Sequence, residues 1–233
     1  MTSWVGQLPR IVVDFLFPSH CIGCGKIGAF LCESCSRNLP KISLPICNKC
    51  GKPESTAVLC PTCWGWQSQI DGIRSPFRFE GVIRQVIHEL KYHNLKAIAG
   101  RAAELLFDYL QFNPMPGEVL VPVPLHKKRL RQRGYNQSEL LVNELSKLTA
   151  LPVIGNCLLR VKDSLPQAKT ATVNARRSNV ANAFICTDQR LNSKHVLLID
   201  DVCTSGATLE GCATALKSAG VISVWGLTLA REI

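Results

Sequence analysis

The stretch VLLIDDVCTSGAT, residues 196–208, has the composition of a buried strand, a short loop and the first turn of a helix. Its opening apolar run is typical of a strand covered on both faces, as the strands of a parallel sheet are. Two acids, Asp200 and Asp201, end this predicted strand. Because ligands of a parallel sheet bind beyond the carboxyl ends of its strands, we expect a binding site at these acids.

The loop that follows the acids is suited to a phosphate group. Backbone N–H groups are free at the N-terminus of a helix, and the helix dipole attracts an anion there. Gly206 lets the backbone come close to a ligand, and the neighbouring hydroxyls add hydrogen-bond donors. The predicted phosphate-binding residues are Thr204, Ser205, Gly206, Ala207 and Thr208.

Two carboxylates beside a phosphate site need their own explanation, because they repel a bare phosphate. They fit if they accept hydrogen bonds from sugar hydroxyls or face a metal ion. One Asp could merely cap the helix, but two acids followed by TSGAT exceed what capping requires. No G-x-x-x-x-G-K-[ST] loop occurs in the chain, which argues against a Walker A nucleotide site. Together, the donors and acceptors suit a ribose 5-phosphate.

The sequence on either side of this stretch alternates strands with helices. Strands are predicted at residues 118–123, 195–199 and 221–230. Helices are predicted at 82–90, at 97–111, after a capping box at Asn136 and Glu139, and from 207 to just before Gly220. The helix after Asn136 is expected to turn four leucines inward, Leu140, Leu141, Leu145 and Leu148. This alternation predicts an α/β fold with a parallel sheet flanked by helices.

Eight of the 12 cysteines form four C-x-x-C pairs, Cys21/Cys24, Cys32/Cys35, Cys47/Cys50 and Cys60/Cys63. Each pair can supply two thiolates, and two pairs complete a closed Cys₄ site, so we expect two structural zinc ions. Pairing in sequence order and an interleaved arrangement both fit the spacing. Glycines follow Cys24 and Cys50, where a knuckle turn favours positive φ.

Two other cysteine-related patterns have simpler interpretations. The segment GCGKIG, residues 23–28, matches a dinucleotide-binding pattern. It lies among the zinc ligands, without the strand and helix that such a site requires. The remaining cysteines lie singly in apolar stretches, where we expect core residues: Cys157, Cys186, Cys203 and Cys212.

The chain has 233 residues and a net charge of +10, which favours an anionic partner such as a phosphate-bearing small molecule or a nucleic acid. The apolar run IVVDFLF, residues 11–17, is too short to span a bilayer, and no secretion signal is recognisable. We therefore expect a cytoplasmic protein with no membrane span. An amphipathic helix is expected over residues 1–17, a zinc-ribbon or knuckle module over 1–65, and the α/β domain over 66–233.

Several motifs carry a resemblance to known families. The stretch VLLIDDVCTSGAT resembles the ribosylpyrophosphate-binding motif of type I phosphoribosyltransferases. Three further segments resemble the ComF/GntX family of competence-associated proteins, HELKYHN (88–94), VPVPLHKKRLRQRGYNQSELL (121–141) and RRSNVANAF (176–184). The cysteine module before the α/β domain is also similar to that family, so the resemblance covers nearly the whole chain.

The resemblance implies binding of 5-phosphoribosyl pyrophosphate (PRPP) together with Mg²⁺. The 5-phosphate would lie on the loop 204–208, and the two acids would hold the ribose 2- and 3-hydroxyls. A second loop would hold the pyrophosphate, and by position it comprises Leu125, His126 and Lys127, with Arg133 in the basic stretch that follows. A phosphoribosyltransferase displaces this pyrophosphate from C1 through an oxocarbenium-like state, and Mg²⁺ neutralises the leaving group. The sequence does not identify the acceptor.

A mobile flap is expected from the resemblance over residues 164–184. In the family pattern a leucine follows the glutamine and an acid precedes an arginine pair. In this chain AKTATVNA separates Gln167 from Arg176 and Arg177. This departure leaves open whether the chain catalyses a transfer.

Two non-enzymatic interpretations also stay open. Proteins of the ComF family are associated with natural transformation, so the zinc module and the basic stretch 127–133 could contact single-stranded DNA, with affinity that falls steeply with salt. Aromatic residues make up only 6% of the chain, which disfavours a general stacking platform for single strands. Zinc ribbons also dock proteins, so a DNA-import helicase or another competence protein is a further candidate partner.

Overall fold

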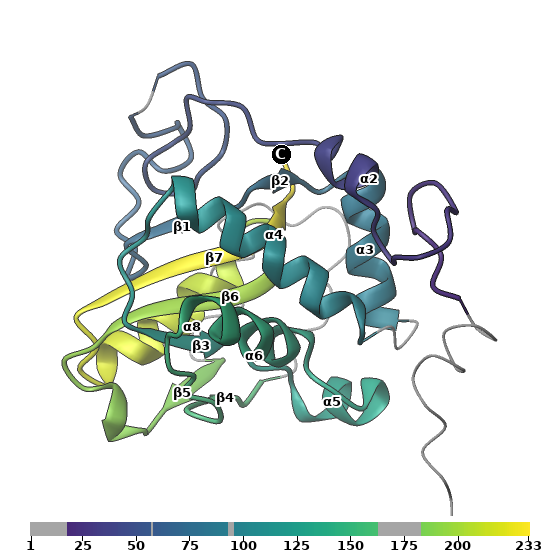
Figure 1. Cartoon of the computed structure of the whole chain (residues 1–233). Helices are drawn as coiled ribbons and strands as arrows, with labels where there is room; N and C mark the ends of the chain where they lie inside the picture. Colours follow the sequence, from purple (N-terminus) through teal and green to yellow (C-terminus); the bar gives the residue numbers. More distant parts are fainter. Residues whose placement is uncertain (1–17, 57, 93–95, 163–182) are drawn as a thin grey trace, which may run out of the picture.

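The computed structural model describes residues 18–56, 58–92, 96–162 and 183–233, and its centre is a five-stranded sheet (Figure 1). The strands are β1 Gly72–Arg74, β2 Phe77–Arg78, β3 Val119–Pro122, β6 His195–Cys203 and β7 Ser223–Arg231. The order is β1-β7-β6-β3, β2 pairs with β7, and every pairing in this sheet is parallel. The predicted parallel sheet is confirmed.

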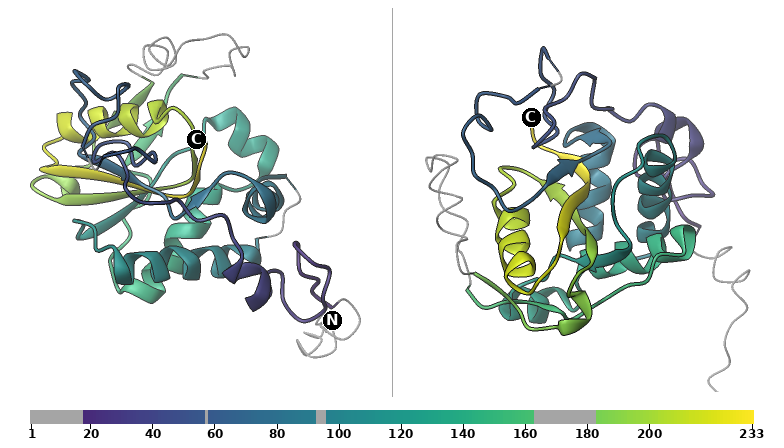
Figure 2. Two further views of the ribbon diagram at one scale, coloured as in Figure 1. Left: turned by 90° about the horizontal axis from the view of Figure 1, so that it is seen from above. Right: turned by 90° about the vertical axis from the view of Figure 1, so that its left-hand side faces the viewer.

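Helices cover both faces of the sheet, as the two views of Figure 2 show. On one face α3 Gly81–Tyr92, α4 Ile98–Phe112 and α6 Gln137–Thr149 pack with Leu197 and Ile199 of β6. On the other face α8 Ala207–Ser218 and the antiparallel hairpin of β4 Leu158–Arg160 and β5 Phe184–Cys186 pack with Val196 and Leu198. Because successive residues of a strand point to opposite faces, one apolar run serves two cores.

The strand that carries the two acids is longer than predicted. We expected it to end at Asp200 and Asp201, and this is wrong, because β6 continues to Cys203. The extension is held by β7, whose Arg231 lies opposite Cys203 in parallel register. Both acids are therefore part of the sheet, with only 9% and 2% of their surface exposed, respectively.

The basic stretch 127–133 is also different from the prediction, since it forms a short helix, α5 Lys127–Arg133, rather than a loop. His126 caps its N-terminus by accepting a hydrogen bond from Lys128 N at 3.4 Å. Gly134 ends it in the left-handed region at φ 79°, a conformation that costs glycine little. The loop predicted to hold pyrophosphate is therefore limited to the residues before this helix.

The helix α6 begins where the sequence indicated. Asn136 is its N-cap and accepts a hydrogen bond from Ser138 N at 3.1 Å. Leu141 and Leu145 are fully buried, as predicted. The prediction for Leu148 is wrong, because this residue lies in the last turn of the helix and remains 40% exposed.

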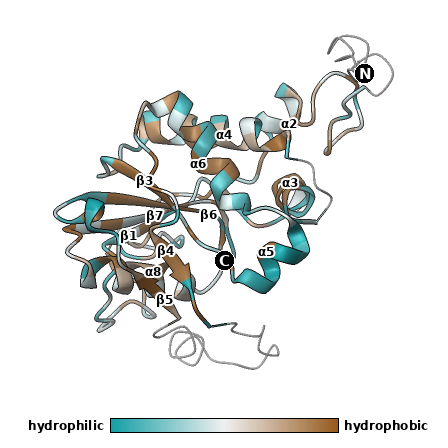
Figure 3. Ribbon diagram, turned by 90° about the horizontal axis from the view of Figure 1, so that it is seen from below, coloured by the Kyte–Doolittle hydropathy of each residue, from teal (hydrophilic) through white to brown (hydrophobic). Residues whose placement is uncertain are grey.

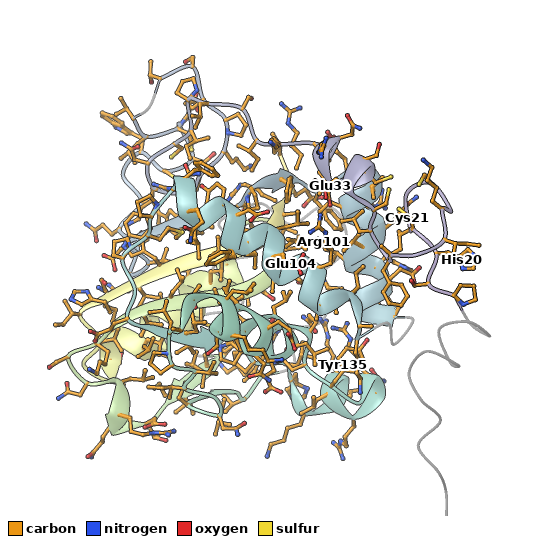
Figure 4. All side chains as sticks on the ribbon, viewed as in Figure 1. His20, Cys21, Glu33, Arg101, Glu104 and Tyr135 are labelled. Atoms are coloured by element: carbon orange, nitrogen blue, oxygen red, sulfur yellow. The ribbon has the colours of Figure 1, made fainter. Side chains whose placement is uncertain are left out.

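The N-terminal cysteine-rich segment packs into the same core as the α/β elements. Cys21, Leu31 and Leu39 are buried in one cluster with α3 and α4. Arg101 of α4 donates a hydrogen bond from Nη2 to Ser36 Oγ at 2.8 Å, in the short helix α2 Glu33–Arg37. Figure 4 shows this arginine directed at α2.

Backbone hydrogen bonds also join the cysteine-rich segment to the edge of the sheet. Ile73 N of β1 donates to Lys49 O at 2.8 Å. Arg78 N of β2 donates to Pro40 O at 2.8 Å. The segment therefore covers the side of the sheet where β1 and β2 lie, as Figure 1 shows.

Two predicted segments fall largely outside the described residues, the helix over 1–17 and the flap over 164–184. Within the part of the chain that the structure describes, no helix has both the length and the apolar character needed to cross a membrane.

Candidate functional site

Two clusters of four cysteines have the geometry of zinc sites. One consists of Cys21, Cys24, Cys32 and Cys35, and the other of Cys47, Cys50, Cys60 and Cys63, with all sulfurs of a cluster within 4.8 Å of one another. The Sγ atoms of Cys24 and Cys32 are 3.7 Å apart, and so are those of Cys50 and Cys60. A tetrahedral zinc ion with Zn–S bonds of about 2.3 Å separates its sulfurs by roughly 3.8 Å. The donor sets therefore fit zinc, and the pairing follows sequence order.

The two zinc sites differ in their exposure to solvent. In the first site Cys24 is exposed, whereas every ligand of the second site is buried. Glycines support both knuckles, because Gly25 and Gly51 have φ values of 74° and 72°, as the sequence predicted. At Gly51 a Cβ atom would come within 2.4 Å of Ile73 O. The backbone of the second knuckle therefore packs directly against β1.

Ser138 and Lys91 approach the two acids of β6 from the helices that cover the sheet. Asp200 Oδ1 accepts hydrogen bonds from Ser138 Oγ and from Asp201 N, both at 2.9 Å. Asp201 Oδ2 lies 2.9 Å from Lys91 Nζ, and the lysine side chain keeps 22% of its surface exposed. One carboxylate is thus fixed by neutral donors, whereas the other is paired with a cation that can move into solvent.

Burial has a large effect on the ionisation of this pair. It raises the pKa of the Asp200 carboxyl to about 7, and the neighbouring Asp201 carboxylate adds to the rise. Lys91, Asp201 N and Ser138 act in the opposite direction. The native protein therefore retains a proton on Asp200 at pH values where the unfolded chain, with a pKa of about 3.9, has lost it.

This difference predicts a stability change in Asp200→Asn. As pH rises from about 4 to 7, the unfolded chain releases its proton first, so the free energy of unfolding of the wild type falls. The amide keeps an oxygen acceptor and cannot ionise, so the variant's advantage should grow by about 1 to 3 kcal/mol between pH 5 and pH 8. Urea unfolding at the two pH values measures this.

Asp188→Asn is the matched control for that experiment. Asp188 is paired with Arg190 at 2.5 Å, which lowers the pKa of its carboxyl. The Asp188→Asn variant should therefore have no larger free energy of unfolding than the wild type at pH 8. An Asp200→Asn variant with the same pH profile as the wild type would contradict the assigned pKa.

The loop after β6 has the predicted helix N-terminus. Gly206 is the N-cap of α8 with φ 78°, and a Cβ atom there would lie 3.1 Å from Ile73 Cδ1. Glu210 N donates to Gly206 O in the first bond of the helix, which leaves the N–H groups of Thr208 and Leu209 outside the helical ladder. Ser205 Oγ accepts from Ala207 N at 3.4 Å. A small anion at this turn would meet backbone donors.

Cys203 lies at the end of β6 rather than in the loop, and burial raises the pKa of its thiol. It is therefore a core residue, as predicted, and Cys157 and Cys212 are buried too, whereas the same prediction is wrong for Cys186, which is only half-buried.

Three of the predicted pyrophosphate residues, Leu125, His126 and Lys127, line a cavity of about 360 Å³ beside β4. Asn136 and Glu139 also contribute to it, whereas the two acids of β6 do not. The ribbon of α5 has the colour of strongly hydrophilic residues in Figure 3. The acid pair therefore lies outside the lining of this cavity.

Arg133 is directed elsewhere. Its Nη1 donates a short hydrogen bond to Gln137 Oε1, and its guanidinium lies 5.5 Å from the centre of the Tyr92 ring. Tyr135, labelled in Figure 4, donates from its hydroxyl to Leu90 O at 2.6 Å. These contacts tie the end of α3 to the start of α6, and they place Arg133 outside the cavity-lining residues.

Sequence analysis missed Lys91 and Ser138 as site residues. Both lie in segments that carry the family resemblance, 88–94 and 121–141, but neither residue was expected to contact the acids. Their contacts with the acids cross 110 and 62 positions of the chain. Periodicity along the sequence carries no signal for such pairs.

Comparison with known proteins agrees with this architecture. The model of the double zinc ribbon domain matches residues 12–64. The chain is thus an α/β protein in which a double zinc ribbon precedes a parallel sheet flanked by helices.

Proteins of similar sequence identify the family to which this α/β protein belongs. The chain is 31% identical over 210 residues to Competence protein F of Haemophilus influenzae, which covers 86% of this chain and 90% of that protein. It is 29% identical to Competence protein ComFC of Bacillus subtilis, with coverage of 87% and 84%, respectively. DNA utilization protein YhgH of Escherichia coli K12 is 27% identical over 205 residues, 84% of this chain and 89% of that protein. The chain belongs to the ComF/GntX family of competence-associated proteins, and the predicted family is confirmed.

The solved structures that align with part of this chain are more distant. Glutamine PRPP amidotransferase from B. subtilis aligns with 57% of this chain and 26% of its own, at 17% identity and a TM-score of 0.39. Purine phosphoribosyltransferase from Pyrococcus horikoshii aligns with 56% of this chain and 71% of its own, at 18% identity and a TM-score of 0.35.

Proposed function

We propose that the protein binds PRPP, or another ligand with a ribose 5-phosphate group, together with Mg²⁺, in the uptake or processing of transforming DNA. The observation that carries this proposal is the continuity of β6, the Gly206 turn and the N-terminus of α8. Two buried carboxylates thus lie a few residues before a helix N-terminus, and helix N-termini in general favour anions. The 5-phosphate would contact Thr204, Ser205, Gly206, Ala207 and Thr208.

Asp201 is the carboxylate best suited to exchange its partner for a sugar. Asp200 is already held by Ser138 and by the Asp201 backbone. Asp201 is paired with Lys91, whose side chain is partly exposed and can swing away. Ribose hydroxyls would then take the place of the Lys91 ammonium group at Asp201. The displaced ammonium group would remain close enough to attract the anionic ligand. Lys91 thus joins the proposed site.

Pyrophosphate and its metal ion would lie toward the loop before α5. Leu125, His126 and Lys127 line the adjoining cavity, and Arg133 would contribute positive charge from the helix behind them. Carboxylate oxygens such as those of Asp200 and Asp201 are ligands that Mg²⁺ accepts. When bound, Mg²⁺ would neutralise the pyrophosphate. Transfer of the phosphoribosyl group to an acceptor would be a further step of the same site.

Calorimetric titration of the zinc-loaded chain with PRPP and Mg²⁺ tests the proposal. The wild type should show saturable binding. The double variant Asp200→Asn/Asp201→Asn should bind at least about tenfold more weakly, because hydrogen bonds to charged groups contribute about 1.5 to 3 kcal/mol each. Asp188→Asn, a change of an acid outside the site, should bind like the wild type. Absence of binding by a folded, zinc-loaded wild type would remove the PRPP proposal.

A second candidate function is a non-catalytic module that contacts single-stranded DNA or a partner such as a DNA-import helicase. The basic helix α5 favours it, because Lys127, Lys128 and Arg131 are exposed. Binding to phosphates would weaken steeply with salt. A chain that binds single strands in this way but ignores PRPP would support this alternative.

We also propose a cytoplasmic location for the protein, and a division of the chain into a zinc module, residues 1–65, and an α/β domain, residues 66–233.

A further inference from the structure

A buried arginine lies between the second zinc site and the phosphate loop. Arg231, the last residue of β7, is only 1% exposed. Its Nη1 donates a short hydrogen bond to Cys50 O, and the same atom lies 3.3 Å from Cys203 Sγ. One side chain thus contacts a zinc ligand and the residue that directly precedes the loop 204–208.

The charge of this guanidinium requires an explanation. Burying a cation is costly unless an opposite charge compensates it. Among the described residues no carboxylate forms an ion pair with Arg231, and its Nε has no hydrogen-bond partner there. A zinc ion bound by four thiolates carries a net charge of about −2. The second site, once loaded, is therefore the compensating charge.

The phosphate loop and the second zinc knuckle share one support. Ile73 N donates to Lys49 O in the knuckle, and the Ile73 side chain lies against the face of Gly206. Glu232 N donates to Cys203 O at 2.9 Å. A shift of the knuckle would therefore displace the loop through two sets of contacts, those of Ile73 in β1 and those of Arg231.

We propose that Arg231 is a positioning residue that locks the phosphate loop to the second zinc site, so that zinc in this site, and not in the first, sets the affinity for the phosphate group. Zinc at Cys47, Cys50, Cys60 and Cys63 fixes Cys50 O and neutralises the guanidinium, which in turn holds Cys203. Loss of this zinc releases the loop. The part that concerns ligand affinity rests on the proposed function, whereas the ordering of the loop does not.

Arg231→Gln tests the link, with Arg74→Gln as the matched control. Arg74 also donates to the second knuckle, to Asn48 O at 3.1 Å, and its guanidinium otherwise contacts Ile73 O and the Trp225 ring rather than the loop. Both full-length variants should retain two zinc ions by metal analysis. In Arg231→Gln, amide hydrogen exchange of residues 203–208 should accelerate at least about tenfold, and ribose 5-phosphate should bind at least about fivefold more weakly. Arg74→Gln should match the wild type in both measurements.

Cys203→Ala tests the same link without touching the arginine or the zinc, and it decides the matter if Arg231→Gln does not fold. It should also accelerate exchange in residues 203–208. Cys47→Ser should do the same, whereas Cys24→Ser, in the first site, should not.

The outcomes separate the two proposals. A wild type that does not bind ribose 5-phosphate, but whose loop exchange responds to Arg231→Gln, would overturn the proposed function and support the link. Unchanged exchange in both Arg231→Gln and Cys203→Ala, or an equal response to Cys24→Ser, would overturn the link.

Discussion

Cys47→Ser should hold one zinc ion per chain instead of two and should lose about 3 kcal/mol or more of its free energy of unfolding. Cys47 is fully buried, and its three partner cysteines are at most 6% exposed. Removing one ligand opens this closed site and leaves the buried Arg231 without its compensating charge. For a chain of this size, the thermal midpoint should fall by roughly 6 to 12 °C. Metal analysis and thermal unfolding measure the two effects.

Cys186→Ser is the matched control, because it makes the same atomic change at a half-buried cysteine that belongs to neither cluster. It should keep both zinc ions and shift stability by less than about 1 kcal/mol. If Cys47→Ser kept two zinc ions and the wild-type midpoint, the assignment of the second site would be wrong.

Gly206→Val should weaken the binding of ribose 5-phosphate at least about a hundredfold, which corresponds to roughly 2.7 kcal/mol. Gly206 has φ 78°, where a β-branched side chain is strained, and its Cβ would also press on Ile73 Cδ1 at 3.1 Å. Relief of both strains must move the turn that directs the first N–H groups of α8. Calorimetry with ribose 5-phosphate measures the loss.

Gly81→Val controls for backbone strain as such. Gly81 also has a positive φ, 54°, but a Cβ there meets nothing within 4 Å. This variant should lose some stability and keep the affinity of the wild type. If Gly206→Val bound ribose 5-phosphate as tightly as the wild type, the phosphate would not lie on this turn.

The long elements could be predicted because their apolar residues repeat with a clear period. The helix at Gly81–Tyr92 shows this best, whereas the strand with Val196 to Ile199 was indicated by a continuous apolar run, which is typical of burial on both faces. The strands β1 and β2 have three and two residues, which is too short for any periodicity to appear. The sequence also could not choose between sequential and interleaved zinc pairing, because C-x-x-C spacing is the same in both.

The sequence predicted which residues form the candidate site, but not the residues from distant segments that contact them. The two acids and the Gly206 turn follow one another along the chain, so local sequence identified them. Lys91 and Ser138 reach the acids only because α3 and α6 pack on the same face of the sheet. Tertiary packing of this kind leaves no local pattern. The helix α5 was missed because a dense run of cations has no apolar stripe to indicate a helix.

The cysteine-rich segment also protects the sheet from other molecules. An uncovered strand edge offers unpaired N–H and C=O groups on which a second chain can assemble. Here the carbonyl oxygens of Lys49 and Pro40 accept hydrogen bonds from the outer N–H groups of β1 and β2. Without its metal, the knuckle that carries Lys49 would no longer be held in place, and the strand behind it would become a template for intermolecular pairing. Zinc in the second site would then act against aggregation as well as for the fold.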